Sequence, residues 1–218
     1  MTVDVGLPKG VVAVTTAWEA PAGSSRGVVA IAPGAGAKFD NAFLVGFAAV
    51  LRELGFTTVR FNFPYAEQGR RMPGPAAHAV LTWRAVVAWI RAEAPDLPLW
   101  ACGKSYGGRM ASMAAVEGMA VDGLVYLGYP LHAPGKPEKP RAEHLPAIAA
   151  PQLFVEGTND PFVQPLSQLE QAVAACQDAT ISWIDGGGHS FEVKGNRRPA
   201  DVVGAGLAPL VAEFIGKR

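Results

Sequence analysis

Short apolar segments that alternate with helical ones constrain the fold of this chain more than any other feature. The runs at 27–32 (GVVAIA), 98–103 (PLWACG) and 124–128 (LVYLG) hold almost no polar residues, and the segments between such runs have the spacing of helices. A strand without a polar face must be covered on both sides, which is typical of parallel sheets between two helical layers. We therefore predict an α/β fold with a mostly parallel central sheet and helices on both faces.

The same pattern places the individual elements. We expect strands at 11–18, 27–32, 57–63, 98–103, 124–128, 152–155 and 180–184, and helices at 41–54, 76–94, 105–117, 165–176 and 201–215. Asp40 is expected to cap the first helix, and residues 65–75 to form a loop. The length of 218 residues, without an internal repeat or linker, predicts a single domain over residues 1–218.

Composition excludes several classes of function. Half of the residues are hydrophobic, 17% are charged and the net charge is zero, so we expect a large core and no nucleic-acid partner. Cys102 and Cys176 are too few for a disulfide framework or a zinc site, and we interpret both as core residues. No leader pattern opens the chain and no apolar run approaches the ~18 residues of a membrane span. A cytoplasmic location without a membrane span is the resulting expectation.

Residues 101–108 (ACGKSYGG) carry the strongest local motif, and it has two interpretations. GKS resembles the end of a phosphate-binding loop, but that loop needs a glycine where this chain has Pro98. The glycine-rich turn at 34–39 also fails the dinucleotide pattern, because Phe39 stands at the third glycine position. The remaining interpretation is G-x-S-x-G, with Ser105 between a strand and a helix as in a nucleophile elbow. Gly103 and Gly107 supply the small residues that such a tight turn requires.

An acid and a base follow Ser105 in the chain order that this architecture uses. Asp160 comes just after the strand at 152–155, and His189 follows the last strand through three glycines. Because ligands bind beyond the carboxyl ends of parallel strands, all three side chains are expected at one edge of the sheet. Other acids and histidines fit the order or placement less well: Asp178, Asp185, His78, His132 and His144.

These residues resemble the α/β-hydrolase superfamily over nearly the whole chain, in particular its small, lid-less, dienelactone-hydrolase-like branch. Four stretches carry the closer similarity: 61–65 (FNFPY), 103–109 (GKSYGGR), 129–132 (YPLH) and 156–161 (EGTNDP). The resemblance implies a single-domain α/β-hydrolase fold without a cap domain, since the segment between the strands at 124–128 and 152–155 is short. Dienelactone hydrolases use a cysteine nucleophile, so Ser105 does not imply their substrate, and Pro33-Gly34 stands where relatives often have His-Gly.

The expected activity is that of a serine hydrolase that cleaves a carboxylic ester or thioester through an acyl-serine intermediate. His189 would act as general base and acid, and Asp160 would orient its ring. The backbone N–H groups of Tyr106 and Ala35 are the predicted oxyanion donors, and neither a metal nor an organic cofactor is needed. Two alternatives stay open: a non-catalytic interaction scaffold with this fold, and an acyltransferase with the same triad.

A small-molecule acyl substrate is the expected partner, and its contacts are less constrained by the sequence. The predicted substrate-binding residues are Gly36, Tyr65, Lys104, His132 and Phe162. Basic residues near the elbow suggest a further hypothesis, that the substrate is anionic and is bound by Arg70, Arg71, Lys104 or Arg109.

Overall fold

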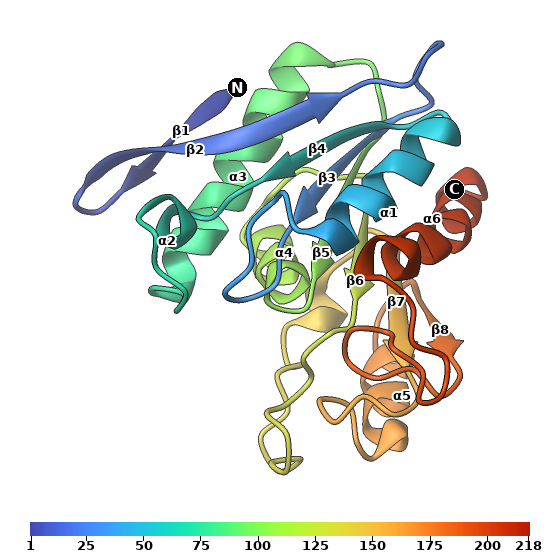
Figure 1. The fold of residues 1–218 in the computed structure, drawn as a ribbon. Coiled ribbons are helices and arrows are strands. Elements are labelled where there is room, and N and C mark those ends of the chain that lie inside the picture. Colours follow the sequence, from blue (N-terminus) through green and yellow to red (C-terminus); the bar gives the residue numbers. More distant parts are fainter.

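An eight-stranded twisted sheet in the order β1-β2-β4-β3-β5-β6-β7-β8 forms the centre of the molecule (Figure 1). The computed structural model describes residues 1–218. The strands β3 to β8 run parallel, whereas β1 and β2 are antiparallel to their neighbours. The predicted α/β fold is confirmed, and none of its helices has both the length and the apolar character needed to cross a lipid bilayer.

The bounds of the elements lie close to those expected. The strands are β1 (Thr2–Leu7), β2 (Gly10–Glu19), β3 (Val28–Ala32), β4 (Thr57–Phe61), β5 (Leu99–Lys104), β6 (Gly123–Leu127), β7 (Gln152–Gly157) and β8 (Ala179–Ile184). The helices are α1 (Ala42–Glu53), α2 (Pro64–Glu67), α3 (Ala76–Glu93), α4 (Tyr106–Val116), the 3₁₀ turn η1 (Leu145–Ala147), α5 (Leu166–Ala174) and α6 (Ala200–Gly216).

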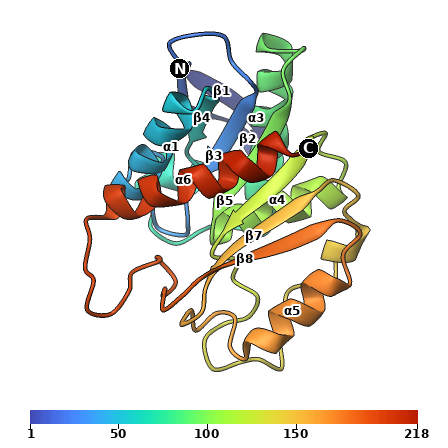
Figure 2. The ribbon, with the colours of Figure 1, turned by 90° about the vertical axis from the view of Figure 1, so that its right-hand side faces the viewer.

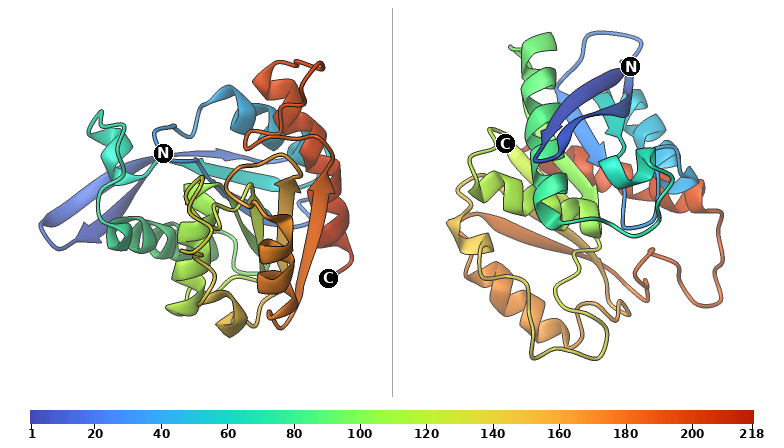
Figure 3. Two further views of the ribbon diagram at one scale, coloured as in Figure 1. Left: turned by 90° about the horizontal axis from the view of Figure 1, so that it is seen from below. Right: turned by 90° about the vertical axis from the view of Figure 1, so that its left-hand side faces the viewer.

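Three local expectations were wrong. Strand β1 was missed, because it is a half-exposed antiparallel strand that extends with β2 beyond the rest of the sheet (Figure 3). Part of the expected loop at 65–75 belongs to the short helix α2, which Pro64 begins. The cap of α1 is Asn41 rather than Asp40, and its side-chain oxygen accepts the N–H of Leu44 at 3.2 Å.

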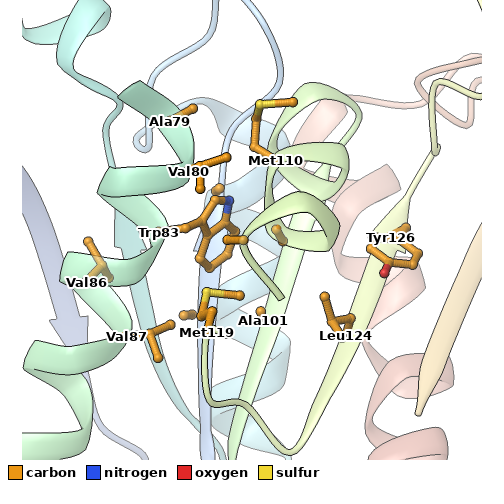
Figure 4. Packing of buried hydrophobic residues seen from close by; sticks show 14 of the residues in the cluster. Ala79, Val80, Trp83, Val86, Val87, Ala101, Met110, Met119, Leu124 and Tyr126 are labelled. Carbon is orange, nitrogen blue, oxygen red and sulfur yellow. The ribbon is translucent and has the colours of Figure 1, made fainter. Parts of the chain in front are cut away.

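Helices cover both faces of the sheet and divide the core in two. Helices α3, α4 and α5 contribute to one apolar cluster, while α1 and α6 pack together on the opposite face (Figure 2). In the first cluster, Trp83 of α3 lies beside Met110 of α4 (Figure 4). Its buried indole N–H donates to the carbonyl of Gly107 at 3.0 Å. The core is thereby tied to the turn that follows β5.

Two glycines allow α1 and α6 to touch backbone to backbone. A Cβ atom on Gly204 would lie 2.0 Å from the carbonyl oxygen of Phe43, and one on Gly46 would lie 2.1 Å from that of Asp201. No side chain fits at such distances, so glycine is required at both positions. The contact brings the first turns of α1 and α6 together at the end of the sheet where β3 and β5 finish, and these turns form part of the site described below.

Gly204→Ala is expected to lower the free energy of unfolding by about 3 kcal/mol, because the new methyl group must push two backbones apart. Gly206→Ala, two residues later in α6, is the matched control. Its Cβ would meet nothing closer than 3.9 Å, so helix propensity should instead stabilise the protein by about 0.5–1 kcal/mol. Urea denaturation of both variants measures the difference. Equal effects of the two substitutions would contradict the backbone contact.

Candidate active site

Ser105 occupies a tight turn between β5 and α4. Its backbone has φ 48° and ψ −112°, a strained conformation that non-glycine residues rarely adopt. The turn closes because its neighbours lack side chains: a Cβ on Gly103 would lie 2.1 Å from the amide nitrogen of Gly108, and one on Gly107 would lie 2.6 Å from the carbonyl oxygen of Pro33. The serine hydroxyl is therefore held beyond the carboxyl end of the sheet.

A chain of two hydrogen bonds joins Ser105 to His189 and His189 to Asp160. The Nε2 atom of His189 lies 2.8 Å from the serine Oγ, and its Nδ1 atom lies 2.6 Å from Oδ2 of Asp160. Asp160 is fully buried after β7, and its Oδ1 accepts the N–H of Phe162 at 2.8 Å. Three residues that are far apart in the sequence thus meet at one edge of the sheet.

Phe162 covers the histidine. Its ring stacks on the imidazole of His189 with centroids 4.2 Å apart and planes inclined by 30°. The side chain of His189 is 23% exposed, which leaves one edge of the ring open toward Ser105 and the neighbouring pocket. The stacking restricts rotation of the ring and supports the geometry of the hydrogen-bond chain.

Two backbone N–H groups lie near the serine. That of Tyr106 belongs to the first turn of α4, where no preceding carbonyl of the helix is available as a partner. That of Ala35, in the loop after β3, donates no hydrogen bond within the protein. Ala35 and Ser105 line the same pocket. Both N–H groups are suitable donors to an oxygen that becomes negatively charged beside Ser105.

A pocket of about 530 Å³ opens beside Ser105 and His189. Much of its wall comes from the first turns of α1 and α6, which the glycine contact holds together. Its apolar lining consists of Ala35, Ala37, Phe43, Phe162, Ala200 and Val203. Polar side chains at the pocket are those of Asn41, Lys104, Ser190, Glu192 and Arg198.

Only some of the expected substrate-binding residues line the pocket. Lys104 and Phe162 line the pocket, but Gly36, Tyr65 and His132 do not. His132 is fully buried, with its backbone N–H bonded to the carbonyl of Phe162 at 3.1 Å. The hydroxyl of Tyr65 accepts the N–H of Gly36 at 3.3 Å, so Tyr65 supports the loop that carries Ala35.

Of the basic residues suggested for an anionic substrate, Lys104 lines the pocket and the three arginines do not. Arg70 lines a different cavity, between the β1–β2 hairpin and the start of α3, and neither Arg71 nor Arg109 lines the pocket. The arginine at the pocket is Arg198, in the segment before α6. Sequence reasoning missed it, together with Phe43 and Val203, because the packing of α6 on α1 has no local sequence signal.

A second serine–histidine pair exists in the molecule, between Ser112 and His144. The two atoms Oγ and Nε2 lie 2.7 Å apart, but Ser112 is fully buried inside α4 and its hydroxyl donates to the carbonyl of Arg109. Burial lowers the pKa of His144, with Arg109 adding to the effect. Neither Ser112 nor His144 lines the pocket beside Ser105 and His189.

Comparisons with known proteins identify the family and the fold of this chain. The family described as "Alpha/beta hydrolase domain" matches residues 25–203. A Mycobacterium tuberculosis protein, provisionally named as a phosphoribosyl transferase, is 30% identical over 178 residues, which are 78% of this chain and 38% of that relative's length. Among solved structures, dienelactone hydrolase from Anabaena variabilis has 21% identity and a TM-score of 0.77, covering 100% of this chain and 96% of its own. A serine hydrolase without lid from Xanthomonas campestris has 23% identity and a TM-score of 0.71, covering 98% and 94%. These two structures show a shared fold.

Proposed function

The chain belongs to the alpha/beta hydrolase family, and from this premise we propose that it is a serine hydrolase that cleaves carboxylic esters through an acyl-serine intermediate. The observation that carries the proposal is the hydrogen-bond chain from buried Asp160 through His189 to Ser105, which ends at an open pocket. A serine hydroxyl is a weak nucleophile by itself, and a histidine oriented by a buried carboxylate is the arrangement that activates it.

In this mechanism Ser105 Oγ attacks the ester carbonyl while Nε2 of His189 takes the hydroxyl proton. The carbonyl oxygen becomes an oxyanion, which accepts hydrogen bonds from the N–H groups of Ala35 and Tyr106. The intermediate collapses, the alcohol leaves with the proton from His189, and an acyl-serine remains. Water then attacks this ester with His189 again as base, which releases the acid and restores Ser105. Asp160 stabilises the transient imidazolium and does not itself become protonated.

Phosphoribosyl transfer is not part of the proposal. The relative that carries this name is more than twice as long as the part that this chain matches, so its name describes a larger protein. The one segment of this chain that resembles a phosphate loop has Pro98 at the required glycine. The apolar wall of the pocket, with Phe43 and Val203, supports an uncharged acyl or alkyl group instead.

Hydrolysis of p-nitrophenyl acetate, butyrate and hexanoate, together with the matching thioesters, tests the proposal. We expect turnover of the oxygen esters, preceded by a burst of p-nitrophenol that does not exceed one equivalent of enzyme, because the acyl-serine accumulates. Turnover confined to thioesters would contradict the ester assignment. A protein that hydrolyses no member of the series and does not react with a fluorophosphonate probe would favour the non-catalytic scaffold.

Ala200→Phe is expected to narrow the pocket, because Ala200 is exposed at the first turn of α6 and lines it. The value of kcat/KM should fall about tenfold or more for the longest member of an ester series, with a much smaller change for the acetate. Val202→Phe is the matched control, since Val202 is exposed on the same helix and does not line the pocket. One series varies the acyl chain and another the alcohol. Unchanged length dependence in both would exclude this pocket as the binding site.

A further inference from the structure

Lys104, the residue between Gly103 and Ser105, does not extend freely into the pocket that it lines. Its Nζ atom donates to the backbone carbonyl of His189 at 2.7 Å, and this is the one hydrogen bond that the ammonium group makes. Its Cγ atom lies beside Gly34, so the alkyl chain crosses the base of the pocket from the elbow to the histidine loop. The side chain thus connects the residue before Ser105 directly to His189.

Two other residues make room for this connection. Gly128, at the end of β6, has φ +72°, and a Cβ atom there would lie 3.0 Å from the lysine Nζ and 3.1 Å from the carbonyl oxygen of His189. On the other side, the ring of Phe191 lies with its centroid 5.6 Å from Nζ, within the range of a cation–π contact. The site for the ammonium is therefore formed by the ends of β5 and β6 and by the histidine loop itself.

A buried carboxylate lies behind the ammonium. Glu156, near the end of β7, is fully buried; its Oε1 accepts the N–H of Tyr129, and its Oε2 has no hydrogen-bond partner in the protein. Burial raises the pKa of Glu156 well above its ordinary value, and Asp160 raises it further, while Lys104 lowers it. A buried acid and a buried ammonium are each costly by themselves, and their attraction offsets part of that cost.

We propose that Lys104 is a positioning residue, which anchors the carbonyl of His189 so that the imidazole stays within reach of Ser105. The proposal rests on the serine hydrolase function proposed above. Backbone hydrogen bonds hold Gly187 and Gly188, which precede His189, whereas the carbonyl of His189 itself accepts only the hydrogen bond from Lys104. Because the hydrogen bond from an ammonium group is about twice as strong as one between neutral groups, it is a suitable anchor for such a loop. A displacement of about 1 Å of a reacting group can lower the rate about 10²-fold.

A dependence of kcat on pH is expected from the same role. Burial lowers the pKa of Lys104 from its ordinary value of 10.5 to about 8, and the acids that face it, Glu156, Asp160 and Glu192, oppose the shift. Below about pH 8 the amine is charged and the anchor is strong; above it the amine becomes neutral and the bond weakens. We therefore expect kcat to decline as the pH rises through about 8.

As the pH rises through this range, kcat is expected to fall, but the contribution of Lys104 to the free energy of unfolding should rise. Between about pH 8 and 10.5 the unfolded chain binds a proton at Lys104 that the folded chain has lost, so this residue makes the free energy of unfolding rise with pH. Below pH 8 the folded state holds a charge in a partly dry site, which lowers its stability. Replacement by an uncharged side chain of similar length removes both effects.

Lys104→Met tests the proposal, because methionine keeps much of the alkyl chain and removes the ammonium. We expect kcat for a neutral ester to fall about 10²-fold at pH 7 with little change in KM, the alkaline decline of kcat to disappear, and the free energy of unfolding to stay equal or increase. Lys104→Arg keeps a charged donor and should recover part of kcat without an alkaline decline near pH 8. Lys38→Met, at an exposed lysine outside the pocket, is the matched control.

A readout that needs no catalysis separates this inference from the proposed function. In the native protein the proton between Nδ1 of His189 and Asp160 should give a sharp downfield NMR signal, and Lys104→Met should broaden or remove it. If Lys104→Met leaves both the NMR signal and kcat as they are in the native protein, the positioning role is overturned. A rise in KM confined to anionic esters would also overturn it, because Lys104 would then be a substrate contact. A native protein with no ester turnover but a Lys104-dependent histidine signal would contradict the proposed function alone.

Discussion

Ser105→Ala is expected to lower kcat for p-nitrophenyl esters about 10⁶-fold and to abolish reaction with a fluorophosphonate probe. In the proposed mechanism the loss is large because the serine oxygen forms the acyl bond, and His189 and Asp160 act through it. The hydroxyl is half-buried at a strained turn whose backbone position alanine can occupy, so the fold should be retained. Stopped-flow kinetics and intact-protein mass spectrometry after labelling measure the two effects.

Ser112→Ala is the matched control for this experiment. Ser112 also has a histidine at 2.7 Å, but it is fully buried and does not line the pocket beside Ser105, so the variant should be labelled as the native protein is. Labelling that persists in Ser105→Ala, or disappears in Ser112→Ala, would mean that the nucleophile is assigned to the wrong serine. Both substitutions remove a single oxygen atom, which makes their effects directly comparable.

Asp160→Asn is expected to lower kcat about 10⁴-fold while leaving KM nearly unchanged. An asparagine that turns its NH₂ group toward Nδ1 of His189 favours the tautomer with the proton on Nε2. That nitrogen, 2.8 Å from Ser105 Oγ, then has no lone pair to accept the hydroxyl proton. The variant also loses the negative charge that stabilises the imidazolium. Its kcat and its rate of fluorophosphonate labelling should fall together.

Asp185→Asn is the control, because Asp185 is the acid that precedes the glycines leading to His189. It is exposed, and its contact with the hydroxyl of Thr158 is long, at 3.4 Å. We expect kcat to change by less than about twofold, as for a surface substitution that leaves the fold intact. A native-like kcat in Asp160→Asn, or a large loss in Asp185→Asn, would contradict the assignment of the acid.

The positions of most elements could be predicted because parallel strands that are buried on both faces appear in the sequence as short apolar runs. Strands β3, β5, β6 and β7 all appear near their predicted bounds. Strand β1 was missed for the complementary reason: half of its side chains face solvent, and its pairing with β2 is visible only when both strands are in place. The N-cap of α1 is Asn41, one residue after the predicted Asp40. Asp and Asn are both favourable N-cap residues, so the sequence does not decide between two that are adjacent.

Ser105, Asp160 and His189 could be proposed together because each follows its own strand, and parallel strands finish at the same edge of a sheet. The hydrogen bonds among them are consistent with that reasoning. Three of the five predicted substrate-binding residues lie outside the pocket, and for two of them the physical reason is clear. Tyr65 and His132 also follow strands, but their side chains turn into the protein, toward the loop before α1 and into the core, and strand order says nothing about that direction.

By itself the sequence determined the α/β architecture and the order in which Ser105, Asp160 and His189 follow their strands, because both depend on periodicity and on position along the chain. The tertiary structure alone decided the pocket and the contact between Lys104 and the histidine loop. Helices α1 and α6 form the pocket wall through a contact between Gly46, Gly204 and distant backbone atoms. Lys104 meets the carbonyl of His189, 85 residues away in the chain. Packing between elements that are far apart in sequence sets these contacts, so no local pattern could reveal them.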